Sequence, residues 1–370
     1  MNIYPPQIVH VRPELERMNE YVPGESAEAF SIRTGIPIDK LIKLNSNENP
    51  YSPACAVLSA LSDHTLYNYY PDTNAIALRA ALSAYTGLDD RFIVLGHGSM
   101  ELISLLWHIF LAVGDNIICC PPTYSFYTPV ATLCGTDVLE VPRTCNYDVD
   151  VDSILAALTP ETKIIILCSP NNPTGNPVSE ANVLALLETG RIVVVDEAYV
   201  EFSHQPRGFA HLVPQYDNLV ILRTFSKWAS LAGLRIGYGV FPEWIAGYMR
   251  RAQCPFEVNA AGYIAAIATL NNLEYVMDNV RKIVEERERL FKVLASQPYL
   301  EPIPSEGNFI LARVSDEEVS VQVVRAVVES HGILLRYFKP PYLHNFLRVT
   351  VGLPEHTDKL AGALEKVMMG

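Results

Sequence analysis

"RIVVVDEAY", residues 191–199, places three consecutive valines directly before an acidic residue, Asp196. Similar short apolar runs occur at 116–120 ("NIICC"), 163–169 ("KIIILCS") and 219–224 ("LVILRT"), and they alternate with segments of helical spacing. Such runs are typical of parallel strands that helices cover on both faces, so we expect an α/β fold with a mostly parallel sheet sandwiched by helices. Ligands of such sheets bind outside the carboxyl ends of the strands. The residues that follow these runs are therefore the candidate site residues.

The composition excludes some classes of protein. The chain has 370 residues, of which 49% are hydrophobic and 19% charged, a balance typical of a folded protein with a large core. Its net charge of −13 disfavours a nucleic-acid partner, because binding the phosphate backbone requires clustered lysines and arginines. An anionic ligand would have to be held by a few well-placed cations.

The cysteines and the apolar segments predict a cytoplasmic location. Seven cysteines, an odd number without any CxxC spacing, indicate free thiols in a reducing compartment. The first residues lack the features of a signal peptide, and the longest apolar run, 102–113, is too short to span a bilayer. The pair His204 and His211 lacks a third ligand at useful spacing, so we expect no metal site.

The chain is expected to divide into three segments. Residues 1–45 would form an N-terminal segment that contributes to a small domain and to the substrate site, and residues 46–260 a large domain that carries the main sheet. Residues 261–370 would form a small α+β domain, which begins with one long helical stretch over about 260–296.

The residues at the predicted strand ends suggest a particular chemistry. Asp196 at the end of a buried strand needs a partner for its charge, although from this residue alone a cap or a loop salt bridge is as good an explanation as catalysis. Lys227 follows another strand, where burial would lower the pKa of its amine and allow Schiff-base formation. Ser226 and Arg235 add a hydroxyl and a guanidinium suited to a phosphate. Pyridoxal phosphate offers a matching aldehyde, phosphate and pyridine nitrogen.

Three motifs carry a resemblance to a known family. "SPNNPTG" (169–175), "VVVDEAY" (193–199) and "TFSK" with "AGLRIGY" (224–238), in this order and at these separations, resemble the fold-type I pyridoxal-phosphate aminotransferases. "LNSNENPYSP", "YYPDTN", "GHGSMEL", "PPTYSFY", "PFEVN", "GNFILAR" and "LRVTVG" spread over most of the chain and are similar to the histidinol-phosphate aminotransferases in particular. The resemblance implies a large domain with a mostly parallel sheet and a small α+β domain.

The resemblance implies roles around the cofactor ring. Lys227 would form the Schiff base with the cofactor aldehyde and move the proton of the substrate, and Asp196 would keep the pyridine nitrogen protonated. Asn172 and Tyr199 would hydrogen-bond the 3-oxygen of the ring, and Tyr124 would lie against its face.

It also implies a phosphate site and a second subunit. The cofactor phosphate would be bound by two residues that open a predicted helix and by two near the lysine, namely Ser99, Met100, Ser226 and Arg235. Tyr70 is expected to reach the phosphate of the neighbouring subunit, which makes the protein a homodimer.

Substrate binding is assigned to four residues, Tyr21, Asn47, Arg336 and Arg348. The two arginines lie in predicted strands of the small domain, where a guanidinium needs a partner, either an anionic substrate or one of the many acids of the chain. By resemblance, Arg348 would bind the carboxylate of glutamate or 2-oxoglutarate. Tyr21 and Arg336 would help to bind a substrate phosphate.

The resemblance implies an aminotransferase acting on L-histidinol phosphate and 2-oxoglutarate in histidine biosynthesis. The alternatives are an aromatic amino-acid aminotransferase, a threonine-phosphate-like decarboxylase, and a cofactor-binding module without turnover, which the presence of both Lys227 and Asp196 disfavours. Three residues depart from the family pattern. Met100 is expected to act only through its backbone N–H, whereas Trp228 and Tyr69 would add aromatic bulk near the cleft and so affect substrate preference.

Overall fold

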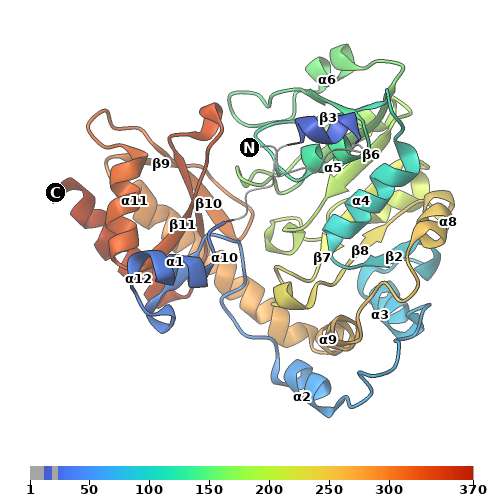
Figure 1. Cartoon of the computed structure of the whole chain (residues 1–370), viewed down its shortest axis with the longest axis horizontal. Coiled ribbons are helices and arrows are strands. Elements are labelled where there is room, and N and C mark those ends of the chain that lie inside the picture. The colour runs from blue at the N-terminus through green and yellow to red at the C-terminus, as the bar shows by residue number, and fades with distance from the viewer. Residues whose placement is uncertain (1–11, 19–23, 370) are drawn as a thin grey trace, which may run out of the picture.

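The run Ile192–Asp196 forms β6, the central strand of a seven-stranded sheet, and all five of its residues are buried. The computed structural model describes residues 12–18 and 24–369, in which this sheet and a second, five-stranded sheet form the centres of two lobes (Figure 1). A central strand needs apolar side chains on both faces, which explains the uninterrupted valines.

The large sheet is parallel except for one strand. Its order is β2 (Ile93–Gly96), β8 (Gly237–Val240), β7 (Leu219–Thr224), β6, β5 (Thr162–Cys168), β3 (Asn116–Cys119) and β4 (Asp137–Glu140). Only β8 runs antiparallel to its neighbours. The expected α/β class with a mostly parallel sheet is confirmed, and the carboxyl ends of six strands meet along one edge.

The small sheet combines strands from distant parts of the chain. Its order is β1 (Ile42–Leu44), β11 (Ile333–Tyr337), β12 (Phe346–Thr350), β10 (Phe309–Val314) and β9 (Leu300–Pro302). β1 pairs parallel with β11, and the other pairs are antiparallel. The three predicted segments, 1–45, 46–260 and 261–370, stay a prediction.

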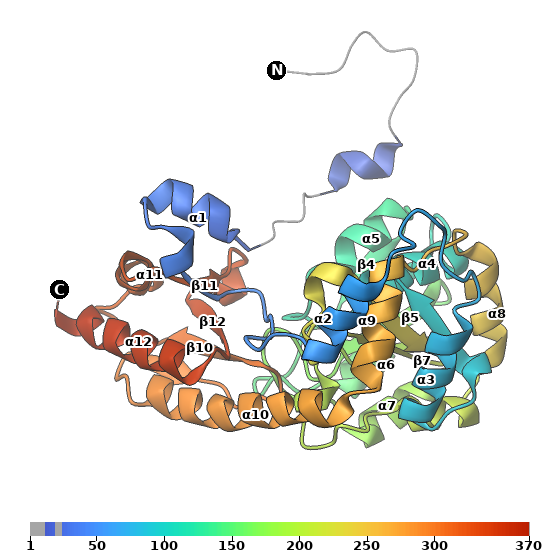
Figure 2. The ribbon, with the colours of Figure 1, turned by 90° about the horizontal axis from the view of Figure 1, so that it is seen from below.

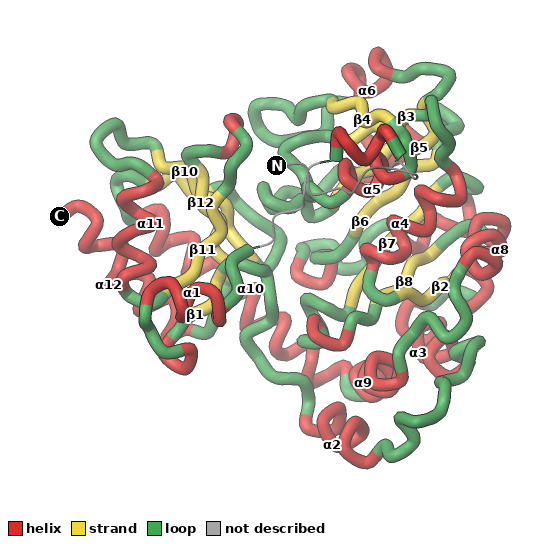
Figure 3. Tube along the Cα trace, viewed as in Figure 1, coloured by secondary structure: helices red, strands yellow, loops and turns green. Residues whose placement is uncertain are grey.

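Helices cover the large sheet on both faces (Figure 3). Alternate residues of β6 belong to two separate cores: Val193 and Val195 are in the same buried cluster as Val183 of α7, and Ile192 and Val194 are in the cluster that includes Leu102 and Leu106 of α4. The α-helices are α1 (Ala27–Thr34), α2 (Cys55–Asp63), α3 (Ile76–Thr86), α4 (Ser99–Phe110), α5 (Tyr127–Leu133), α6 (Val151–Ala157), α7 (Glu180–Leu187), α8 (Glu243–Ala252), α9 (Ala260–Leu270), α10 (Leu273–Ala295), α11 (Val321–Ser330) and α12 (Pro354–Leu364).

Short 3-10 helices complete the secondary structure. They are η1 (Pro13–Arg17), η2 (Ile38–Lys40), η3 (Asp90–Phe92), η4 (Val200–Phe202), η5 (Ala210–Gln215), η6 (Ala232–Leu234), η7 (Pro341–Leu343) and η8 (Glu365–Met369). Within the described part of the chain, every helix is too short or too polar to cross a membrane.

The expectation of a single helix over about 260–296 is wrong. The structure has two helices there, α9 and α10, and two asparagines separate them. Asn271 caps the end of α9, and the Asn272 side chain donates to the Ala268 carbonyl oxygen at 2.8 Å before α10 begins. Asparagine side chains compete with the helical backbone for its hydrogen bonds. α10 then runs along both lobes (Figure 2), and its buried Arg287 donates to the carbonyl oxygens of Phe202 and Gly307.

Candidate active site

Asp196 ends β6 at the carboxyl edge of the large sheet and is 3% exposed. Its carboxylate accepts hydrogen bonds from the Tyr127 hydroxyl at 2.9 Å and the Ala198 N–H at 3.2 Å. Burial raises the pKa of Asp196 to about 6, although the bond from Tyr127 opposes this shift. Among the described residues, Asp196 has no ion-pair partner, so the salt-bridge interpretation is not supported.

Lys227 lies three residues beyond the end of β7. Its Nζ donates to the Ser46 carbonyl oxygen at 3.1 Å and lies 5.9 Å from the centroid of the Tyr199 ring. Burial, followed by the positive charge of Arg348, lowers the pKa of the Lys227 amine to about 8. The neutral, nucleophilic form of this amine is therefore far more populated near neutral pH than it is for an exposed lysine.

A hydrogen-bond chain joins Tyr199 to Arg348. The Tyr199 hydroxyl accepts from the side-chain amides of Asn47 at 3.1 Å and Asn172 at 3.3 Å. The Asn172 side-chain oxygen in turn accepts from Arg348 Nη1 at 2.6 Å. Burial raises the pKa of Tyr199, so it keeps its proton at neutral pH. Asn172 follows β5 and Tyr199 follows β6, which explains why residues from separate motifs meet here.

Ser226, Arg235 and the start of α4 form a cradle for a small anion. Arg235 Nη1 donates to the Ser226 hydroxyl oxygen at 3.3 Å. A Cβ atom on Gly98, which has a φ of 83°, would come within 2.8 Å of Arg235 Nη2. A Cβ atom on Gly237 would come equally close to the Ser99 backbone nitrogen, which begins α4. These glycines leave room where N–H groups and a guanidinium converge, and this fits a phosphate group.

Tyr124 and Met100 lie beside this cradle. The Tyr124 hydroxyl lies 3.5 Å from Met100 Sδ, and the Tyr124 ring meets the Tyr127 ring edge-to-face with centroids 5.5 Å apart. Tyr124 is thus held next to the tyrosine that binds Asp196. This position is compatible with the expected place of Tyr124 against the cofactor ring.

The small sheet presents Arg348 and Arg336 at the same site. The two arginines are opposite each other in the β11–β12 pair, so their side chains lie on one face of the sheet. Arg348 Nη2 also donates to the Asn45 carbonyl oxygen at 2.9 Å. Two guanidinium groups directly opposite each other repel, and an anion bound between them would relieve that repulsion.

Asn47 is fixed in a conformation that few residues adopt. Its φ is 53°, and its backbone N–H donates to the Thr350 hydroxyl at 2.9 Å, while the Thr350 hydroxyl donates to its side-chain oxygen at 3.1 Å. The Asn308 side chain donates to the Asn47 carbonyl oxygen at 3.1 Å. Asn47 thereby joins the small sheet to Tyr199. Tyr21, the other predicted substrate residue, lies outside the described residues.

Tyr70 lies apart from this cluster. It is 79% exposed, and its ring stacks on Phe256 with centroids 4.2 Å apart. Nearby residues on the same segment, Tyr67 and Tyr69, are also more than half exposed.

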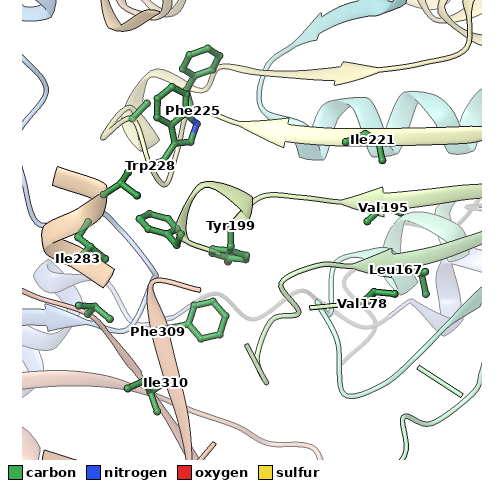
Figure 4. Close-up of a cluster of buried hydrophobic side chains, with 14 of the residues drawn as sticks. Leu167, Val178, Val195, Tyr199, Ile221, Phe225, Trp228, Ile283, Phe309 and Ile310 are labelled. Carbon is green, nitrogen blue, oxygen red and sulfur yellow. The ribbon is translucent and has the colours of Figure 1, made fainter. Parts of the chain in front are cut away.

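The expectation that Trp228 adds bulk near the cleft is wrong. Its side chain is fully buried and stacks on Tyr85, with centroids 5.5 Å apart and planes 6° apart, and it contacts Phe225 (Figure 4). The chain turns after Lys227 so that the lysine points to the site and the tryptophan into the core.

Sequence reasoning missed several residues that build the site, above all Tyr127, Ser46, Asn45 and Thr350. Tyr127 lies in the quoted motif "PPTYSFY", three residues after Tyr124, and the need of a buried Asp196 for a donor was the signal. Ser46 and Asn45 act through their backbone carbonyl oxygens. Every residue has such an oxygen, so the residue type could not predict their roles.

Comparisons with known proteins agree with this geometry. The model of the family "Aminotransferase class I and II" matches residues 39–364. A histidinol-phosphate aminotransferase of Dehalococcoides mccartyi is 42% identical over 96% of this chain and 97% of its own length. A chloroplastic histidinol-phosphate aminotransferase of Arabidopsis thaliana is 41% identical, over 96% and 85% of the two chains.

A solved structure extends the similarity to the fold. The histidinol-phosphate aminotransferase of Sinorhizobium meliloti, in complex with pyridoxal-5'-phosphate, superposes with a TM-score of 0.87 at 25% identity, over 98% of each chain. The expected fold-type I architecture is confirmed.

Proposed function

Because this chain belongs to the class I and II aminotransferase family, and within it to the histidinol-phosphate aminotransferases, we propose that it exchanges an amino group between L-histidinol phosphate and 2-oxoglutarate. One observation carries the proposal. The Lys227 amine, whose pKa is lowered, lies in the same site as the hydrogen bonds that link Tyr199 through Asn172 to Arg348. The first element suits an aldehyde cofactor and the second a substrate carboxylate.

The site residues fit pyridoxal phosphate. When bound, the cofactor supplies an aldehyde and a ring that accepts electrons. We propose that Ser99, Met100, Ser226 and Arg235 bind its phosphate, the first two through backbone N–H groups, since these residues border the cradle that glycines 98 and 237 keep open. Asp196 would bind the protonated ring nitrogen, and Tyr124 would cover the ring.

The remaining groups would hold and move protons or bind substrate. Tyr199 and Asn172 would hydrogen-bond the ring oxygen, since both already converge on one point. Lys227, with its pKa near 8, would take the proton from the substrate carbon and hold it for its return. Arg348 would bind the α-carboxylate, and Arg336, Asn47 and Tyr21 the rest of the substrate.

We further propose a homodimer in which Tyr70 completes the phosphate site of the partner subunit. Exposed apolar side chains of one segment support this proposal, namely Leu66, Tyr67, Tyr69, Tyr70 and Ile76, together with Phe256, on which Tyr70 stacks. Monomeric proteins rarely expose so many large apolar side chains together. Mixing Lys227→Ala and Tyr70→Ala subunits should restore activity that neither homodimer has, because mixed dimers contain one intact site; no recovery would exclude shared sites. The cytoplasmic location stays a prediction.

Two measurements test the function. Adding L-glutamate to the cofactor-loaded protein should convert the visible absorbance band to that of the pyridoxamine form, and a band that persists would exclude glutamate as amino donor. Turnover of L-histidinol phosphate should then exceed that of phenylalanine and O-phosphothreonine. Equal or better use of phenylalanine would favour an aromatic aminotransferase, and release of CO₂ from O-phosphothreonine would favour a decarboxylase.

A further inference from the structure

Phe309, the first residue of β10, lies between two groups of the site and is fully buried. Its ring meets the Tyr199 ring nearly at right angles, with centroids 5.0 Å apart and an interplanar angle of 78°. The Arg348 guanidinium carbon lies over the same ring, 5.3 Å from its centroid. In Figure 4 the Phe309 ring extends from β10 toward Tyr199. One apolar side chain therefore contacts both the phenol and the arginine.

The register of the small sheet explains this position. Phe309 pairs with Thr350, and Leu311 with Arg348, in the antiparallel β10–β12 pair. Phe309 is thus the diagonal neighbour of Arg348 on the same face, a distance that aromatic and long side chains can bridge. A Cβ atom on Gly307 would come within 2.6 Å of the Phe309 ring, so the glycine two residues earlier makes room for it.

We propose that Phe309 is a positioning residue that orients Arg348 and Tyr199 together and thereby sets the affinity of the site for the substrate carboxylate. The proposal rests on the proposed function, in which Arg348 binds that carboxylate. The negative face of an aromatic ring attracts a guanidinium, most strongly where water is excluded. Aromatic rings also prefer an edge-to-face contact, so Phe309 favours one orientation of the Tyr199 ring.

Phe309 links elements that belong to different sheets. Tyr199 follows β6 of the large sheet, whereas Phe309 and Arg348 are on β10 and β12 of the small one. Arg348 donates hydrogen bonds to the side-chain oxygen of Asn172 and to the Asn45 carbonyl oxygen, and these bonds hold the tip of its side chain. The ring beneath the guanidinium restricts the plane in which that tip lies, and a bidentate contact with a carboxylate depends on this plane.

The experiment compares Phe309→Leu with Phe309→Tyr in the cofactor-loaded full chain. Leucine keeps apolar volume without a π-face, while tyrosine restores the ring. Phe241→Leu is the matched control, because Phe241 is equally buried but belongs to the other core of the large sheet, away from these contacts. The probe is maleate, an unreactive dicarboxylate, titrated by its effect on the visible absorbance, and the pH at which that absorbance changes is recorded without ligand.

Phe309→Leu should weaken maleate binding by roughly two- to thirtyfold, the range of one cation–π contact, and should shift the pH midpoint of the absorbance. Phe309→Tyr should return both values toward those of the wild type, and Phe241→Leu should change only thermal stability. If Phe309→Leu does not fold, Phe309→Met carries the same comparison.

Unchanged maleate affinity in Phe309→Leu, equal weakening in Phe241→Leu, or no recovery in Phe309→Tyr would each overturn the proposal. The wild-type reaction with glutamate separates this failure from that of the proposed function. A wild type that converts its band with glutamate while Phe309→Leu binds maleate normally sinks only the positioning role. If the wild type does not react with glutamate, both the proposed function and the positioning role of Phe309 are excluded.

Discussion

Asp196 and Glu197 are adjacent in the chain, yet they belong to two buried regions that treat charge differently. Glu197 is 1% exposed and forms a salt bridge with Arg223, whose Nη2 lies 2.7 Å from Glu197 Oε2. Its other oxygen accepts from the Phe209 N–H at 2.6 Å. Asp196 accepts from a phenol and an amide, and Lys227 donates to a carbonyl oxygen. The region around Glu197 and Arg223 pairs opposite charges with each other. The region around Asp196 and Lys227 binds each charged group through hydrogen bonds with neutral groups.

This difference separates a structural role from a functional one. A buried charge costs free energy unless it is paired, so a paired cluster is compatible with stability alone. Asp196 and Lys227 are buried, and their hydrogen bonds to other described residues are with neutral groups, so they carry that cost and a charged ligand would relieve it. Four substitutions test this contrast.

Lys227→Ala should have the largest effect. Turnover should fall roughly 10²–10⁴-fold or more, the range for loss of a proton-transfer group. Thermal stability should change little, because the one hydrogen bond that the amine makes within residues 12–18 and 24–369 is to the Ser46 carbonyl oxygen. Borohydride reduction followed by mass spectrometry should find no cofactor attached to the protein. Lys292→Ala, at an exposed position of α10, is the control. Undiminished turnover in Lys227→Ala would exclude the proposed role.

Asp196→Asn should reduce kcat by roughly 10²–10³-fold, because the amide cannot stabilise positive charge at the ring nitrogen. Its melting temperature should stay equal or rise, since an acid whose pKa burial raises to about 6 is replaced by a neutral group. Steady-state kinetics and thermal unfolding check the two parts. A large loss of stability with kcat intact would reverse the assignment of the two regions.

Glu197→Gln is the same chemical change one residue later and should act in the opposite way. Leaving Arg223 buried without its carboxylate should lower the free energy of unfolding by about 3–5 kcal/mol. Turnover per folded molecule should remain near that of the wild type. Denaturant unfolding together with active-site titration would show this, and a stability equal to that of the wild type would break the contrast.

Glu201→Gln should have the smallest effect on turnover, and it should change the pH dependence of stability. Glu201 is 4% exposed, and burial raises its pKa to about 8. The folded protein then binds one proton more than the unfolded chain between the unfolded pKa near 4.5 and about 8, so stability is highest below this window and decreases as pH rises through it.

The glutamine variant should remove a slope of up to about 1.4 kcal/mol per pH unit from that window. Melting temperatures measured between pH 5 and 8 should therefore be flatter in Glu201→Gln than in the wild type. Glu285→Gln, at an exposed position of α10, is the control and should keep the wild-type slope. Parallel curves for wild type and Glu201→Gln would show that Glu201 is ionised in the folded state.

The large sheet and its edge were the most predictable parts of the molecule. Apolar runs such as 192–195 identify buried parallel strands, and the rule that their carboxyl ends carry the site is sufficient to select Asp196 and Lys227. The direction of the Trp228 side chain was not predictable, because the turn after Lys227 decides whether a residue faces the cleft or the core.

Other features depended on contacts between distant segments. The break between α9 and α10 depends on two asparagines whose side chains either face solvent or bind the helix backbone, and the periodicity does not distinguish these cases. The contacts of Phe309 depend on the register of β10 against β12, which the alternation of residues within one strand leaves open.

The pairing of β1 with β11 has a consequence for the order in which the chain folds. Ile42 pairs with Ile333, so β1 leaves the ribosome long before its partner strand exists. The strands of the large sheet, 93–240, are all synthesised in between and can pair first. Asn45, Ser46 and Asn47 directly follow β1 and contact Arg348, Lys227 and Tyr199. During synthesis, the proposed active site is therefore among the last parts of the molecule to assemble, after the sheet that carries most of it.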